Sequence, residues 1–122
     1  MLEGIFHVRF QSSLATVGEG YTVFDACGIH GANETHLFRG TQCSQNGVLV
    51  LDMEITHLCG EKYPSFGPLD RVHLDLTISE ITQEGFRALG CVREQPAYKL
   101  HILGRRLGEL VKREDGETCV NG

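Results

Sequence analysis

Residues 18–40 read GEGYTVFDACGIHGANETHLFRG, and this stretch sets the pattern for the rest of the chain. Three short runs suited to β-strands, Tyr21–Phe24, Gly28–Ile29 and Thr35–Arg39, are separated there by glycines at close intervals. Glycine adopts a positive φ without steric cost, so it is common in tight turns between strands. The stretch therefore predicts a succession of strands and turns, with its glycines at the corners of a closing sheet.

Alternation of apolar and polar residues extends the same pattern in both directions along the chain. Asn46-Gly47 favours the type I′ turn of a tight hairpin. Short connections favour antiparallel neighbours, and the spacing suits either a sandwich or an up-and-down barrel. We favour a barrel because closure leaves no exposed sheet edge, which predicts an all-β fold of seven to eight antiparallel strands. The run at Thr35–Arg39 forms part of one expected strand, His36–Thr41. The remaining expected strands are Ile5–Phe10, Leu49–Thr56, Val72–Ile78, Phe86–Val92 and Ala97–Leu103.

The barrel is expected to occupy residues 1–104, with a C-terminal tail at residues 105–122. This tail mixes acidic and basic residues, and Leu107, Leu110 and Val111 suit one helical turn before a frayed end. A chain of 122 residues is long enough for one domain with its own core.

Charge and cysteine content narrow the classes of function. A net charge of −5 argues against direct nucleic-acid binding, which needs clustered Lys and Arg. The sequence shows neither a signal peptide at its start nor a run of about 18 apolar residues for a membrane helix. Five cysteines, at positions 27, 43, 59, 91 and 119, form an odd number without a close pair. We therefore expect a reduced, cytoplasmic protein that does not bind membranes.

Catalytic and metal-binding motifs are weak. His57 and Cys59 would share a strand face, and His30, His36 and Cys43 are further ligand types that folding can bring together. Without a Cys-x-x-Cys motif, however, we expect no metal and no cofactor, and a zinc-stabilised module stays a minor alternative. Nothing in the local sequence holds a base against a cysteine, as a nucleophile would need, and a solvated strand face accounts for Asp52 and Glu54. The sequence thus predicts a protein that is not an enzyme.

The inward faces of the expected barrel are apolar. Eight-stranded barrels either fill with side chains or hold one small ligand. Large Phe and Leu side chains favour filling, but a carrier or sensor of a small apolar ligand remains an alternative function. The expected lining residues are Phe6, Val8, Phe10, Tyr21, Val23, Leu49, Leu51, Met53, Leu74, Leu76, Leu100 and Ile102.

Glycine and aromatic positions across the first strands carry a family resemblance: Gly4-Ile5-Phe6, Phe10, Gly18-Glu19-Gly20, Val23, Gly28-Ile29-x-Gly31 and Phe38-x-Gly40. In these positions the chain resembles the GrlR-like family of small negative regulators of type III secretion. The resemblance implies a lipocalin-like β-barrel that is homodimeric and non-catalytic. It also implies a protein partner, because the characterised regulator acts by holding a transcriptional activator.

The chain departs from that family at the turn between residues 43 and 47. The regulator carries alternating acidic residues there, whereas this turn is uncharged, so its electrostatic recognition device is missing. We therefore expect a cytoplasmic regulatory or binding barrel whose partner differs. The candidate partner-binding residues at this turn are Ser44, Gln45, Asn46 and Gly47.

Overall fold

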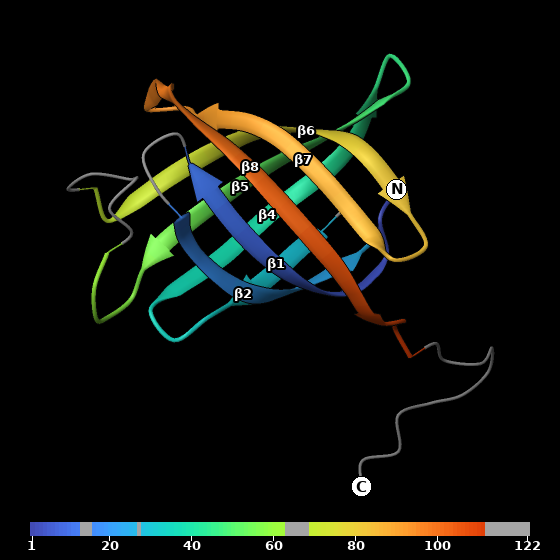
Figure 1. Cartoon of the computed structure of the whole chain (residues 1–122), viewed down its shortest axis with the longest axis horizontal. Helices are drawn as coiled ribbons and strands as arrows, with labels where there is room; N and C mark the ends of the chain where they lie inside the picture. The colour runs from blue at the N-terminus through green and yellow to red at the C-terminus, as the bar shows by residue number, and fades with distance from the viewer. Residues whose placement is uncertain (13–15, 27, 63–68, 112–122) are drawn as a thin grey trace, which may run out of the picture.

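A computed structural model describes residues 1–12, 16–26, 28–62 and 69–111 of the chain. The described residues form eight β-strands and no helix (Figure 1). The residues Cys27 and Cys119, and the tail from residue 112 onward, lie outside the described part. The strands are β1 (Gly4–Ser12), β2 (Thr16–Asp25), β3 (Gly28–Ala32), β4 (His36–Gln45), β5 (Val48–His57), β6 (Arg71–Thr82), β7 (Gly85–Val92) and β8 (Gln95–Gly108).

The strands close into a single antiparallel barrel. Each strand pairs with the next one in sequence, and β8 pairs with β1, for example Ile102 with Phe10. This is the up-and-down order of eight-stranded lipocalin-type barrels. The all-β, antiparallel barrel predicted from the alternation is confirmed, at the upper end of the expected strand number.

Strand β8 extends beyond the boundary expected at residue 104. Arg105 pairs with His7 and Gly108 pairs with Ile5, so Leu107 belongs to a strand and not to a helical turn. The alternation of apolar and polar residues is interrupted here, because Arg106, a charged residue, occupies an inward position at the end of the barrel. Its guanidinium carbon lies 4.8 Å from the centre of the Phe6 ring, and its Nη1 donates to the Glu3 carbonyl at 2.7 Å. A charged side chain can take this position because its guanidinium lies over the Phe6 ring and donates to the Gln83 and Glu3 carbonyls at the barrel end.

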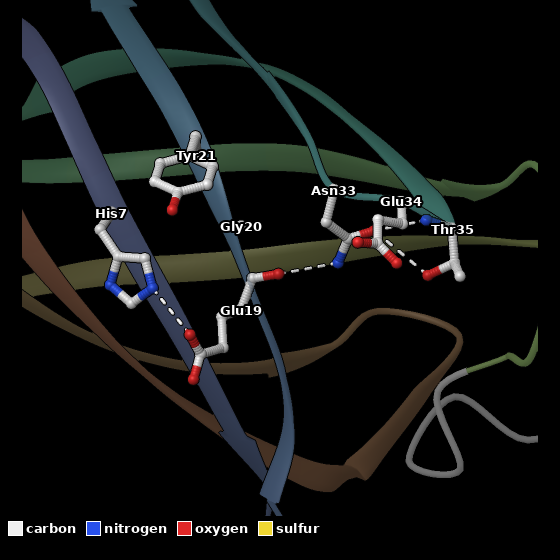
Figure 2. A pocket seen from close by; sticks show the side chains of 7 residues that line it. All are labelled: His7, Glu19, Gly20, Tyr21, Asn33, Glu34 and Thr35. Atoms are coloured by element: carbon white, nitrogen blue, oxygen red, sulfur yellow. Dashed lines mark hydrogen bonds and ion pairs between the residues drawn. The ribbon is translucent and has the colours of Figure 1, made fainter.

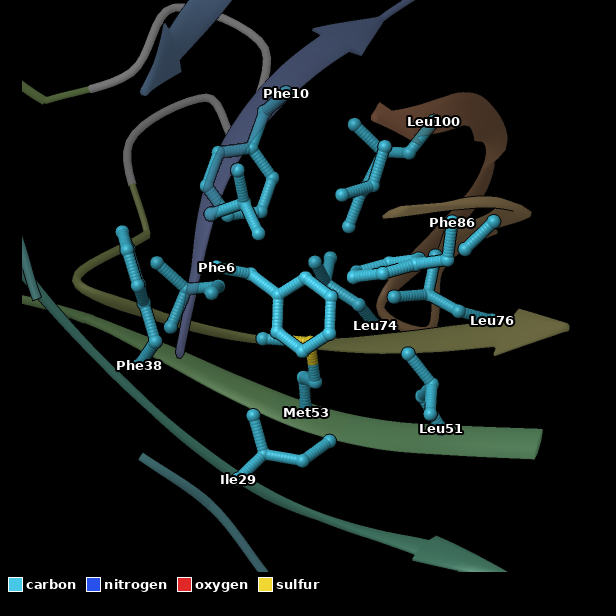
Figure 3. Close-up of a cluster of buried hydrophobic side chains, with 14 of the residues drawn as sticks. Phe6, Phe10, Ile29, Phe38, Leu51, Met53, Leu74, Leu76, Phe86 and Leu100 are labelled. Carbon is cyan, nitrogen blue, oxygen red and sulfur yellow. The ribbon is translucent and has the colours of Figure 1, made fainter. Parts of the chain in front are cut away.

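The barrel interior is filled by aromatic and aliphatic side chains (Figure 3). Phe6, Phe24 and Phe86 form a mutual edge-to-face cluster, with ring centres 5.3 to 5.4 Å apart. Phe10 and Phe38 form a second pair at 5.2 Å. Such edge-to-face pairs stabilise the fold beyond the area that they bury. The buried core consists of Leu2, Phe6, Val8, Phe10, Phe24, Ile29, Phe38, Leu51, Met53, Ile55, Val72, Leu74, Leu76, Phe86, Ala88, Val92, Leu100 and Ile102.

Two inward glycines make room for these rings. A Cβ at Gly20 would lie 2.5 Å from the Phe38 ring, and a Cβ at Gly104 would overlap the Phe86 ring. Gly20 therefore sits within β2 and faces a ring across the interior. The sequence pattern predicted a corner of the barrel at this glycine, and that prediction is wrong for Gly20.

Strand β2 faces the opposite way from the prediction. Tyr21 is 61% exposed and Val23 is half-buried on the outer face, whereas Thr22 and Phe24 are each 1% exposed on the inner face. The pairing of Thr22 with Phe6 fixes this orientation, because paired residues share one side of the sheet. The sequence did not show which set of alternate residues in β2 faces inward, because both sets include an aromatic side chain.

Candidate functional site

The barrel interior leaves almost no free volume. The space lined by Val8, Phe10, Thr22, Phe24 and their neighbours amounts to about 10 Å³, no more than one water molecule needs. The described interior is therefore closely packed by side chains around this space. Nine of the expected lining residues are buried there, Leu49 is partly buried against them, and Tyr21 and Val23 lie outside. The nine are Phe6, Val8, Phe10, Leu51, Met53, Leu74, Leu76, Leu100 and Ile102.

The predicted hairpin at Asn46-Gly47 is present. Gln45 pairs with Val48 across a two-residue turn, and φ is 53° at Asn46 and 80° at Gly47. Positive φ at both central residues is the requirement of a type I′ turn, and it explains why these two residue types occur together here. The hairpin geometry is thus confirmed, whereas its role in partner binding stays a prediction.

This hairpin projects beyond the barrel wall (Figure 1). Pairing of β4 with β3 stops at Thr41, and pairing of β5 with β6 starts only at Val50. Beyond these points the two strands pair only with each other in the described sheet. Residues 43–48 are all exposed. Among the residues that the structure describes, the projection therefore presents an uncharged tip with strand edges that no neighbouring strand covers.

A groove lies on the outer wall, over β1, β2 and the turn between β3 and β4 (Figure 2). His7 Nε2 lies 2.9 Å from Glu19 Oε2, and the His7 ring packs edge-on against Tyr21 at 5.5 Å. Asn33 Nδ2 donates to the Glu19 carbonyl at 2.8 Å, which fastens the turn to β2. The groove has a volume of about 350 Å³, and the Glu34 side chain lines its far end.

This groove can accept polar or cationic groups. Its two carboxylates, on Glu19 and Glu34, and the exposed face of Tyr21 are groups that attract a positive charge. Sequence reasoning missed the groove because residues 7 and 33 are far apart in the chain and meet only through strand pairing. The closest sequence clue was the Glu19 position between two glycines.

The His and Cys residues of the minor zinc alternative lie close together only in part. The rings of His36 and His57 lie 5.3 Å apart, and burial together with the neighbouring His57 lowers the pKa of His36. Cys59 Sγ donates instead to the Glu34 carbonyl at 3.3 Å, and His57 Nε2 contacts the Gly60 carbonyl at 2.8 Å. No group of three His, Cys, Asp or Glu in the described part of the chain is placed to hold a metal ion.

The outer faces of β5 and β6 carry an ion-pair network around Arg93. Asp52 and Asp75 face each other across the two strands. Arg93 Nη2 lies 2.9 Å from Asp52 and 2.6 Å from Asp75. The hydrogen bond from Arg93 lowers the pKa of Asp75, and its charge adds to this effect while partial burial opposes it. Asp52 therefore belongs to a charged outer surface, as the alternation predicted.

Strand β6 continues the network through His73. Its side chain lies 3.5 Å from Glu54 and 2.6 Å from Glu94. Partial burial raises the pKa of Glu94, but hydrogen bonds from the His73 ring and backbone outweigh this and lower it. The network fixes the turn between β7 and β8 against the wall of the barrel.

The strand pairing defines the class of protein at the level of fold. The architecture is that of closed, eight-stranded, up-and-down β-barrels. No family model and no curated protein matches the chain. A solved structure of a redesigned β-barrel is similar, with 17% sequence identity and a TM-score of 0.47, over 87% of this chain and 91% of that one. The described residues include no helix that is long and apolar enough to cross a membrane.

Proposed function

We propose that this protein is a non-catalytic, cytoplasmic regulatory protein that binds a partner protein through the projecting β4–β5 hairpin. The observation that supports this proposal is the contrast between the filled interior and the hairpin that stands clear of the wall. We therefore expect the partner protein to bind the outer surface. The resemblance to regulators of type III secretion makes a transcriptional regulator the expected kind of partner.

The backbone at the hairpin suits pairing with an extended segment. In a two-residue hairpin the closing pair, Gln45 and Val48, bond to each other, so the next pair directs its backbone groups outward. Ser44 and Leu49 form that next pair. Outward N–H and C=O groups on an uncovered edge are a template for a further strand. We assign the partner segment to the β4 edge, where Cys43, Ser44 and Gln45 are all exposed.

The uncharged tip determines how the partner is selected. Ser44, Gln45 and Asn46 offer hydroxyl and amide groups that donate and accept hydrogen bonds without a net charge. Binding at this edge should therefore depend weakly on salt, unlike recognition through acidic residues. This separates the proposed site from the acidic device of the resembling regulator.

Photo-crosslinking in cells tests the proposal directly. Benzoylphenylalanine in place of Gln45 should capture one defined protein, whereas the same residue in place of exposed Glu61, past the opposite end of β5, should not. The captured protein is then purified for affinity measurements. Ser44→Pro removes the outward N–H donor and should weaken binding about tenfold or more, while Ser44→Ala keeps that donor and should bind normally.

Two results would overturn the proposal. One is equal capture from positions 45 and 61, which would show that the hairpin is not a preferred contact. The other is unchanged affinity of a folded Ser44→Pro variant, with folding checked by circular dichroism.

A further inference from the structure

We infer that His36 and His57 form a pH-sensitive switch, which holds the β5–β6 connection (residues 58–62) against the β3–β4 turn (residues 33–35) near neutral pH and releases it in mild acid. The two residues, which we call the histidine pair, face each other in register at the ends of β4 and β5. This end of the barrel lies opposite to the projecting hairpin, as Figure 1 shows. The switch is therefore separate from the proposed partner site and does not depend on it.

His36 occupies a buried position that disfavours a charged ring. It is 2% exposed, and its ring centre lies 5.3 Å from that of His57. A buried charge loses its hydration, and a second positive charge beside it adds repulsion. Burial and the neighbouring His57 accordingly lower the pKa of His36. The closed arrangement of the two connections therefore favours a neutral His36.

The hydrogen bonds of the two rings define where a further proton binds. Thr35 Oγ1 donates to Asn33 Oδ1 at 3.1 Å, so it accepts from His36 Nδ1, which lies 2.6 Å away. A carbonyl oxygen only accepts, so His57 Nε2 donates to the Gly60 carbonyl at 2.8 Å. The basic nitrogens that remain are His36 Nε2 and His57 Nδ1. In mild acid a proton can bind at each of them, and both rings then become cations.

The carboxylate beside the pair can offset only part of this charge. Asp70 Oδ1 lies 3.9 Å from His57 Nδ1, but the same oxygen is bound to Lys62 Nζ at 2.7 Å. A carboxylate shared with a lysine does not balance two positively charged rings. The other titratable groups of the described residues on the surrounding elements are Glu34 in the β3–β4 turn, Cys59 and Glu61 in the β5–β6 connection, Glu19 on β2 and Arg71 on β6.

Hydrogen bonds join the two connections beside the histidine pair. Leu58 N and Cys59 N both donate to the Thr35 carbonyl, at 2.7 and 3.3 Å. Cys59 Sγ also donates to the Glu34 carbonyl at 3.3 Å. These bonds lie beyond the last pair of β4 and β5, so they are not part of the β4–β5 ladder in the described sheet. Repulsion between two charged rings should therefore break these bonds before it disturbs the barrel.

Release of the β5–β6 connection should also alter the groove on the outer wall. Glu34 and Thr35 line that groove (Figure 2). The same two residues supply the carbonyls that hold the connection. The switch therefore couples proton binding at a buried histidine to the shape of an outer surface.

The pH dependence of the switch has a defined direction. His36 binds a proton more readily when the connection is open than when it is closed, because its pKa is lowered in the closed form. Its contribution to the closed form is complete above the ordinary pKa of histidine, about 6.5, and is lost as the pH falls through the lowered value. Over that range the opening constant should rise by up to about tenfold for each pH unit, because opening takes up one proton.

Amide hydrogen exchange, followed by NMR from pH 8 to pH 5, measures this opening. EDTA in the buffer prevents trace metal ions from competing with protons for the rings. After correction for the intrinsic exchange rate, the opening constant at the Leu58 amide should rise below about pH 6.5. The Arg106 amide donates to the Glu84 carbonyl at 2.7 Å at the other end of the barrel, and it should show no such rise.

Substitutions of single histidines test the role of the rings. His36→Gln cannot become charged, so its opening constant at Leu58 should not depend on pH over this range. His30→Gln removes an exposed histidine from the adjacent strand β3, and it should keep the wild-type pH dependence. If His36→Gln does not fold, His57→Gln removes the neighbouring charge instead and should reduce the pH dependence at Leu58.

Three results would contradict the switch. One is an opening constant at Leu58 that does not change with pH in the wild type. Another is an equal rise at Leu58 and Arg106, because acid would then unfold the barrel as a whole. The third is full wild-type pH dependence at Leu58 in His36→Gln, or in His57→Gln where that variant takes its place.

Discussion

The inner and outer faces of the barrel wall follow different rules, and strands β5 and β6 show the contrast directly. On the inner face, Leu51 and Leu74 are at most 1% exposed and pack among other side chains with little space left. On the outer face of the same strands, Asp52 and Asp75 are held by ion pairs to Arg93. The inner face determines which fold forms, through volume and shape. The outer face, where charge is distributed unevenly, is the face that other molecules can reach.

The largest expected effect comes from emptying the inner face. Phe6→Ala should lower the free energy of unfolding by about 3–5 kcal/mol. Phe6 is fully buried, with its ring 5.3 Å from both Phe24 and Phe86, so its removal opens a cavity within the aromatic cluster. Urea unfolding monitored by circular dichroism measures the loss.

The adjacent residue provides the matched control. Ile5 is 37% exposed on the outer face, and Ile5→Ala should cost about 1 kcal/mol or less. Similar losses for the two variants would contradict the division of the wall into a packed inner face and a tolerant outer one.

A smaller effect is expected where a polar side chain enters the inner face at the barrel end. Gln42 is 2% exposed. Its amide accepts from Leu2 N at 2.9 Å and donates to Leu2 O at 2.7 Å and Ala26 O at 2.8 Å. Gln42→Leu should cost about 1–3 kcal/mol, because it leaves these backbone groups without their partner. Unfolding in urea measures the cost, and amide hydrogen exchange at Leu2 should accelerate.

The control for that variant is on the exposed hairpin. Gln45→Leu changes the same chemistry at a position where nothing is buried, and it should alter stability by about 0.5 kcal/mol or less. If Gln42→Leu were as mild as Gln45→Leu, the N-terminal segment would not depend on this amide.

The sequence was sufficient wherever one face of a strand carried charges. In β5 and β6, alternating Asp, Glu and His between apolar residues fixed which side chains point inward, and Asn46-Gly47 fixed the hairpin between β4 and β5. The sequence was not sufficient to orient β2, because Tyr21 and Phe24 lie on opposite faces of this strand and either could be buried. There the choice depends on pairing with β1, which is a property of the folded sheet.

The end of β8 and the outer groove are two further features that the sequence did not predict. Arg106 breaks the alternation because it covers Phe6 at the barrel end, a role that only the three-dimensional position reveals. The groove depends on His7, Glu19 and Asn33, which come from separate elements joined by hydrogen bonds. Each of these residues looks ordinary in sequence. Their combination becomes visible only when the register of β1 and β2 is known.

The smallest expected effect on stability comes from removing Arg93 on the outer face, and this effect should depend on pH. Arg93→Ala should cost about 1 kcal/mol or less near neutral pH, because its partners are about half exposed and solvent screens the pairs. In the wild type, Arg93 lowers the pKa of Asp75. That contribution to stability is complete above the ordinary pKa of an Asp, about 4, and is lost as the pH falls through the lowered value. The difference between wild type and Arg93→Ala in urea unfolding should therefore narrow from about pH 7 to about pH 3. Arg93 binds Asp75 in a bidentate way, through Nε at 3.1 Å and Nη2 at 2.6 Å. Arg93→Lys keeps the charge but loses this bidentate contact, so its stability should fall between those of the wild type and Arg93→Ala. A difference that stays constant over this range would mean that Arg93 stabilises the wall by packing and not by its charge.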